Sequence, residues 1–333
     1  MSSTFVEAEH PRSTTGRFAA KSHAEADLSL DGGTVGDSDG PDGLVRPGRT
    51  PPQVHSHSSL SDFSFCATRW ALERIDGAAV PDDADDSMRQ AGIVAHEAAE
   101  LAATGAGHDE AIDTAMGSHR GAGWYRQFRD GGGTIDQLLD KDARPADAPD
   151  DVVAAVAAAT SFDDWELTDP NRDTLVATEV TIDAEIDGVA LTGVIDAVEQ
   201  DPDGAVVVTD YKTGKPPSQA RLDGDDDLAR FDSDTAPMYP AKTTRQLVLY
   251  AEMAEATGRH VDRVRLLYPA SRKYVEVDLD GPYGDHLRTE ARQFVVTETD
   301  RLLEAHETGV FPASPSPRKC ASCSQAENCP AAA

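Results

Sequence analysis

Basic residues are scarce in this chain: Lys and Arg number 30 against 60 Asp and Glu, which gives a formal net charge of −30. Affinity for phosphate groups comes chiefly from Lys and Arg, so this balance ordinarily argues against a nucleic-acid partner. The argument weakens if the acidic surface is an adaptation to molar salt, because the Debye length is then only about 3 Å. Low lysine together with abundant Asp, Ala and Gly indicates such a halophilic style.

Long apolar runs and a secretory signal are also missing. No stretch approaches transmembrane length, and the first residues lack the charged and apolar regions of a signal peptide. We therefore expect a cytoplasmic protein with reduced thiols and no membrane partner. No GxxxxGKS or GxxxxGKT phosphate loop occurs either, so we expect any helicase activity to reside in a separate subunit.

The chain divides at about residue 54. Residues 1–54 are rich in Ser, Gly, Asp, Thr and Pro without apolar periodicity, which predicts a disordered acidic and polar tail, followed by solvent-exposed His55 and His57. Residues 55–333 are enough for one large domain with its own core.

Apolar periodicity in this domain predicts an α/β fold, a mixed β-sheet flanked by helices. Helices are expected near 59–75, 87–104, around Gln246 and near 283–308, with a helical insertion at 105–165 and a Cys-rich tail at 312–333. Strands are expected near 174–186, 189–199, 205–211, 261–268 and 273–279.

One predicted hairpin carries Asp196, Asp210 and Lys212. Two apolar runs, Val189–Val198 and Ala205–Val208, indicate buried strands joined by an Asp-Pro-Asp-Gly turn. The hairpin brings the two aspartates together, and carboxylates in an apolar sheet resist burial unless a divalent cation neutralises them. Hard oxygen ligands suit Mg²⁺ or Mn²⁺. The ammonium of Lys212, on the same strand face as Asp210, can orient an attacking water.

Further residues extend this pattern. Gly193 precedes Asp196 by three positions, Gln246 and Tyr250 lie four apart on a predicted helix, and His96 lies on an earlier one. In this order the motifs resemble the RecB-like group of the PD-(D/E)XK nucleases, including its AddB-type exonucleases, over about residues 56–330.

The resemblance implies a restriction-endonuclease-like fold and a set of residue roles. The implied roles are metal binding by His96, Asp196, Asp210 and the carbonyl of Tyr211, positioning of the attacking water by Lys212, and a border of the active site formed by Gln246 and Tyr250. The carboxylate of Glu179 could also reach the site and is a secondary candidate.

The four cysteines are Cys66 and, near the end of the chain, Cys320, Cys323 and Cys329. The C-x2-C-x5-C spacing suits a single metal centre with Cys66 as the fourth ligand, and the spacing allows zinc as readily as iron and sulfur. The resemblance favours a [4Fe-4S] cluster, although Ala67 stands where many relatives have Pro. Such a centre would act as a staple, because it closes a loop of about 250 residues.

These observations predict a Mg²⁺- or Mn²⁺-dependent deoxyribonuclease, an exonuclease that acts on single-stranded DNA or DNA ends in repair or recombination. One alternative is a CRISPR adaptation nuclease that trims spacer precursors. Another is a non-catalytic DNA-binding module with a structural metal centre. The acidic composition adds the expectation of a halophilic archaeal source.

Overall fold

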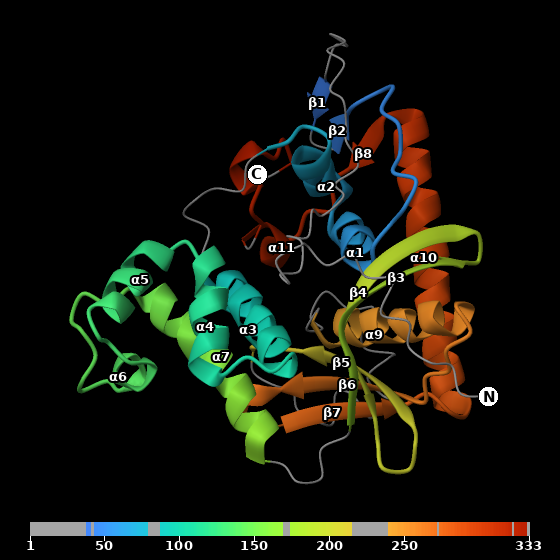
Figure 1. Cartoon of the computed structure of the whole chain (residues 1–333). Coiled ribbons are helices and arrows are strands. Elements are labelled where there is room, and N and C mark those ends of the chain that lie inside the picture. Colours follow the sequence, from blue (N-terminus) through green and yellow to red (C-terminus); the bar gives the residue numbers. More distant parts are fainter. Residues whose placement is uncertain are drawn as a thin grey trace, which may run out of the picture. The chain divides into compact units, whose positions relative to one another are not determined.

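A five-stranded mixed sheet organises the fold (Figure 1). In order across the sheet, its strands are β3 (Thr174–Ile186), β4 (Val189–Gln200), β5 (Val206–Tyr211), β6 (Arg263–Tyr268) and β7 (Lys273–Asp278). Neighbouring strands are antiparallel except β5 and β6. That parallel pair needs a crossover, which helix α9 (Tyr239–Ala256) supplies.

The computed structural model describes residues 38–40, 43–78, 87–168, 174–214, 239–271, 273–321 and 323–331. All of these belong to one compact unit, residues 37–333. None of the helices within the described ranges combines the length and apolar character that crossing a lipid bilayer requires.

Helices cover both faces of the sheet. Leu266 and Leu267, adjacent on β6, belong to different apolar clusters, and adjacent strand residues point to opposite faces. The Leu266 cluster includes residues of α1 (His57–Phe65), α2 (Ala67–Arg74), α9 and α10 (Pro282–Thr308). The Leu267 cluster includes residues of α3 (Ser87–Ala103) and α7 (Asp150–Thr168). The expected mixed sheet flanked by helices is therefore confirmed.

The segment expected to be a helical insertion is helical. It contains α4 (His108–Ala115), a 3₁₀ turn η2 (Met116–Ser118), α5 (Ala122–Asp130) and α6 (Ile135–Leu139), and it leads into α7. These helices share an apolar cluster with α3, separate from the clusters on the sheet. A second core therefore forms around α3, the helix that carries His96.

The two ends of the described chain meet in a small sheet of β1 (Ser38–Gly40), β2 (Gly43–Val45) and β8 (Val310–Pro312). Leu44 lies opposite Phe311, and both are fully buried. Gly43 has φ of +144°, and a Cβ there would lie 2.3 Å from the carbonyl oxygen of Phe311, so only glycine allows this close approach. Beyond β8, the tail contains α11 (Pro317–Ala321) and the 3₁₀ turn η5 (Ala326–Asn328).

The expected tail boundary at residue 54 differs from the structure, in which residues 43–54 form part of the fold. The expectation of solvent-exposed His55 and His57 is wrong, because they are 5 % and 2 % exposed. His55 joins the sheet through a bridge to Leu191 on β4. This short segment has too few apolar residues to show periodicity, and its burial comes from β8 and β4, which lie far away in the sequence. Residues 1–37 lie outside the described range.

The helix expected at 59–75 is two helices, α1 and α2, that meet at Cys66. Cys66 has extended backbone angles and serves as the C-cap of one helix and the N-cap of the next. The break places the Cys66 thiol at a corner between two helices rather than along a helix side. A corner of this kind leaves room for the C-terminal cysteines to approach.

Candidate active site

Three carboxylates form a row across neighbouring strands: Glu179 on β3, Asp196 on β4 and Asp210 on β5. The last paired residues of the antiparallel strands β4 and β5 are Ala197 and Thr209. Continuing this register by one residue on each strand places Asp196 opposite Asp210. The pairs on either side of Glu179 likewise put it opposite Asp196. Directly opposite residues of an antiparallel pair lie close together. The sheet register thus concentrates negative charge at one point.

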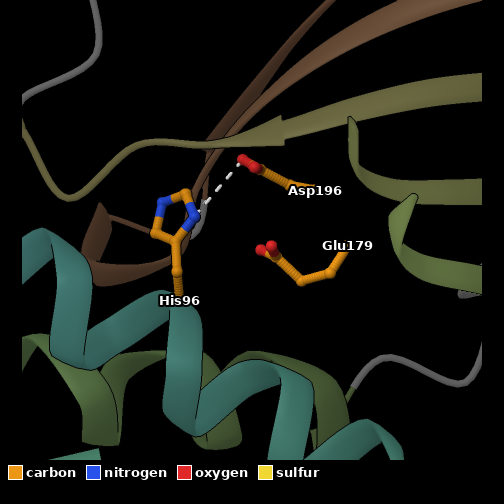
Figure 2. A group of neighbouring side chains, drawn as sticks. All are labelled: His96, Glu179 and Asp196. Carbon is orange, nitrogen blue, oxygen red and sulfur yellow. Dashed lines mark ion pairs between the residues drawn. The ribbon is translucent and has the colours of Figure 1, made fainter. Parts of the chain in front are cut away.

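Glu179 has a left-handed backbone conformation with φ of 49°, and the ladder between β3 and β4 is interrupted there. A non-glycine residue in this region is uncommon, and such strained residues gather at functional sites. Glu179, Asp196 and His96 each offer one ligand atom, and these atoms lie within 4.8 Å of one another (Figure 2). The structure therefore brings the secondary candidate Glu179 into the same group as two of the expected metal ligands.

His96 reaches this group from α3. Two small residues of that helix, Ala95 and Ala99, are buried against Tyr211, so α3 lies close to the sheet. The His96 Nδ1 atom lies 3.5 Å from Asp196 Oδ2, and Nε2 lies 3.0 Å from the carbonyl oxygen of Tyr211. Both ring nitrogens thus face expected metal ligands.

The charge state of His96 follows from these neighbours. Burial lowers the pKa of His96, but the hydrogen bond to Asp196 and the negative charges of Asp196, Asp210 and Glu179 outweigh it. The pKa of His96 therefore lies above its ordinary value. An imidazolium at this place compensates part of the negative charge of the carboxylate row.

Asp210 is only 4 % exposed. Burial and the charge of Asp196 raise the pKa of Asp210 to about 6, although Lys212 and His96 act in the opposite direction. The Lys212 ammonium lies 2.5 Å from Asp210 Oδ2, and the backbone N–H of Tyr211 donates to Asp196 Oδ2 at 2.8 Å. One ammonium and one imidazolium therefore face the three carboxylates of the row, which leaves an excess of negative charge.

The donor set fits a hard divalent cation. His96 contacts both Asp196 and the Tyr211 carbonyl, each through a different ring nitrogen, and Asp210 is close enough to Asp196 to raise its own pKa. A buried carboxylate whose charge is resisted by a neighbouring carboxylate is stabilised by a bound cation. The carboxylate and carbonyl oxygens are hard ligands of the kind that magnesium and manganese take, whereas the imidazole is a ligand that softer divalent ions also accept.

Gln246 and Tyr250 lie one turn apart on α9, and the Gln246 side-chain amide donates to the Tyr250 hydroxyl at 2.9 Å. Burial together with the charges of Asp210 and Asp196 raises the pKa of Tyr250 to about 12, so its hydroxyl stays neutral beside the carboxylates. A Cβ on Gly193 would lie 2.5 Å from Cε1 of Tyr250. Glycine at this position thus lets α9 approach β4.

The four cysteines line one small pocket, together with Phe65, Arg69 and Lys319. All four thiols are free. The C-terminal tail is held at this place by two bonds: Ser324 donates to Glu73 at 2.6 Å, and the Lys319 ammonium donates to the carbonyl of Phe65 at 3.3 Å. The structure therefore gathers the expected cluster ligands from both ends of the domain.

A carboxylate row with one histidine and one lysine, on a mixed sheet flanked by helices, defines an enzyme of the nuclease class that hydrolyses phosphodiester bonds. Comparison with known families agrees: the chain belongs to the PD-(D/E)XK nuclease superfamily, whose family model matches residues 54–330. No curated protein matches the chain.

Two solved structures are similar to the chain at 13 % sequence identity each. One is a protein from Eubacterium rectale that is provisionally named an exonuclease, with a TM-score of 0.45 over 78 % of this chain and 84 % of that protein. The other is SSO0001, with a TM-score of 0.32 over 86 % of this chain and 90 % of that protein.

Proposed function

We propose that this nuclease is a Mg²⁺- or Mn²⁺-dependent deoxyribonuclease, an exonuclease that acts on single-stranded DNA or DNA ends in repair or recombination. The observation that carries the proposal is the convergence of Asp196, Asp210, Lys212 and His96 in one acidic site. Such a site has too much negative charge to be only structural. A metal-dependent nuclease needs this donor set beside one ammonium.

A divalent ion bound here supplies a Lewis acid for the phosphate and a source of hydroxide near neutral pH. The chain's own groups do the rest. Asp196 is oriented by the N–H of Tyr211, and Asp210 is held by Lys212. The Lys212 ammonium, 26 % exposed, can donate to the attacking water and stabilise charge that develops on the phosphate. Gln246 and Tyr250 form a neutral wall beside the carboxylates.

We further propose that Cys66, Cys320, Cys323 and Cys329 hold a [4Fe-4S] cluster. All four line one pocket, so ligands from both ends of the domain come together at one place. The C-x2-C-x5-C spacing with a distant fourth cysteine, which resembles iron-sulfur nucleases of this superfamily, favours the cluster over a zinc ion. We also propose a cytoplasmic location, in which cysteines stay reduced and available to a cluster.

A non-catalytic DNA-binding module would account for the cysteine cavity alone. It would leave the buried Asp210, the neighbouring Asp196 and the Lys212 ammonium without a role, and a protein without a catalytic site would gain stability from replacing these charged side chains. The carboxylate row therefore favours the enzyme. We propose that any helicase activity belongs to a separate partner subunit. The partner proteins decide whether the nuclease acts in repair or in CRISPR adaptation.

The test is cleavage of end-labelled single- and double-stranded DNA in molar KCl with Mg²⁺ or Mn²⁺. We expect the native protein to release short products only with added metal, and Lys212→Ala and Asp210→Ala to release none. Shortening from the labelled end supports an exonuclease, and cleavage of a circular single strand would contradict that mode. Equal activity in the native protein and both variants would refute this active site.

A further inference from the structure

Arg245 on α9 lies in an unusual setting. Its guanidinium carbon is 3.5 Å from the centroid of the Phe294 ring on α10, and its Nε donates to Nε2 of His57 at 3.4 Å. The rings of His57 and Phe294 are themselves 5.8 Å apart. An aromatic face and one imidazole nitrogen thus fix the plane of the guanidinium from two different helices.

The remaining donors of Arg245 have no partner in the described part of the chain. Both Nη groups, with four N–H donors, make no hydrogen bond or ion pair among residues 38–331 that the structure describes. Burial lowers the pKa of Arg245 to about 10, although Glu298 and Glu290 act in the opposite direction at longer range. Glu298 is already paired with Arg301 at 2.7 Å. Within the part of the chain that the structure describes, Arg245 therefore carries its positive charge without a direct ion-pair partner.

His57 supports that charge as a neutral acceptor. It is 2 % exposed, and burial followed by the charges of Arg245, Lys242 and Lys212 lowers its pKa to about 2. A neutral imidazole can accept the Nε–H of Arg245 without repelling it. Ser61 lies 3.3 Å from the same imidazole nitrogen and helps to hold the ring in place.

Arg245 and Lys242 lie on α9, the helix that also carries Gln246 and Tyr250 at the border of the active site. The charge of Lys212, which pairs with Asp210, contributes to the low pKa of His57. Lys242, Gln246 and Tyr250 follow one another at intervals of four residues on α9, so they share one helix face. A strand of DNA whose reacting phosphate lies at Asp210 can therefore continue toward Arg245 and Lys242.

We propose that Arg245, oriented by His57 and Phe294 and assisted by Lys242, is a phosphate-binding subsite for the DNA strand next to the reacting phosphodiester. This inference rests on the proposed function, since it places the strand across the same site. Two parallel Nη donors match two oxygens of one phosphate, a bidentate geometry that a lysine cannot reproduce. A short contact of this kind also persists in high salt, where long-range attraction is screened.

The test measures binding of a labelled twelve-nucleotide single strand by fluorescence anisotropy, in an Asp196→Asn background that removes a metal ligand. In that background we compare Arg245→Met, whose side chain keeps the contact with Phe294, with Arg259→Met as a matched control. Arg259 is exposed and lies just beyond the other end of α9. Metal-dependent cleavage by the native protein is measured separately.

We expect Arg245→Met to weaken binding roughly tenfold or more, as the loss of a charge-assisted contact predicts, and to lower the slope of log Kd against log salt by about 0.7. Arg259→Met leaves both values unchanged. If Arg245→Met does not fold, Arg245→Lys carries the test, with weaker binding than the parent expected. Binding equal to that of the Arg259 control, in either variant, overturns the subsite.

Two further arms separate the sources of phosphate. The two proteins are compared on oligonucleotides that carry a 5′-phosphate or a 5′-hydroxyl. If Arg245 binds a terminal phosphate, Arg245→Met weakens binding of the phosphorylated strand only. If Arg245 binds an internal phosphodiester, Arg245→Met weakens binding of both strands equally. The subsite and the nuclease proposal fail separately. Loss of binding in Arg245→Met supports the subsite even if no metal-dependent cleavage is found, and cleavage with unchanged binding contradicts the subsite alone.

Discussion

Replacing Asp210 by Asn should stabilise the protein when no divalent metal is present. The carboxyl of Asp210 is 4 % exposed and has a pKa of about 6 in the folded protein, against an ordinary value of 3.8. That difference corresponds to a penalty of about 3 kcal/mol on the folded state once the group is ionised. Asparagine has the same shape without the charge, so it removes most of the penalty.

The sign of the effect depends on pH. Below about pH 4 the carboxyl is protonated in the folded and unfolded states, so Asp210→Asn gains nothing. Between about pH 4 and pH 6 the unfolded chain loses its proton first, and the native protein becomes progressively less stable than the variant. At pH 7.5 the full difference applies, which amounts to a rise in Tm of roughly 5 °C for a domain of this size.

Added metal should reverse the order. The native protein gains stability from Mn²⁺ because the ion binds only the folded site, whereas Asp210→Asn lacks a ligand and gains little. The assay is thermal unfolding of both proteins in molar KCl, at pH 4 and pH 7.5, with and without Mn²⁺. Asp203→Asn, an exposed carboxylate in the turn of the same hairpin, is the control and should change neither value. An Asp210→Asn protein less stable than the native one in metal-free buffer at pH 7.5 would refute the reasoning.

Three more predictions follow from other parts of the site. Gly193→Ala should lower the free energy of unfolding by about 1–3 kcal/mol, because the new Cβ meets the Tyr250 ring. Chemical denaturation measures this effect in the native protein and in Tyr250→Ala, where the ring is gone and the effect of Gly193→Ala should be smaller. Mn²⁺ binding near pH 6.5 should release a proton from His96. Titration calorimetry in two buffers of different ionisation enthalpy measures the number of protons released. The same number in His96→Gln would contradict the prediction. Cys320→Ser should lose the brown chromophore and stability on the order of 5 kcal/mol together, while loss of iron at an unchanged Tm would argue against a staple.

The sequence alone determined much of the sheet. The strand limits of β3, β4 and β5, the hairpin turn and the spacing of Gln246 and Tyr250 depend on alternation, turn residues and helical periodicity, which are local properties. The turn between β4 and β5 also fixes their register, and the register puts Asp196 opposite Asp210. The main acidic pair was therefore predictable from one stretch of about 20 residues.

Tertiary structure decided what depends on distant partners. The alignment of β3 on β4, interrupted at Glu179, gives that carboxylate its place in the row. Residues 43–45 are ordered only because β8, more than 250 residues later, pairs with them. His57 is buried, and the Arg245 guanidinium lies against Phe294 and His57, because α1, α9 and α10 meet at one point. Local patterns cannot report such burial, since it arises from elements that become neighbours only after the chain has folded.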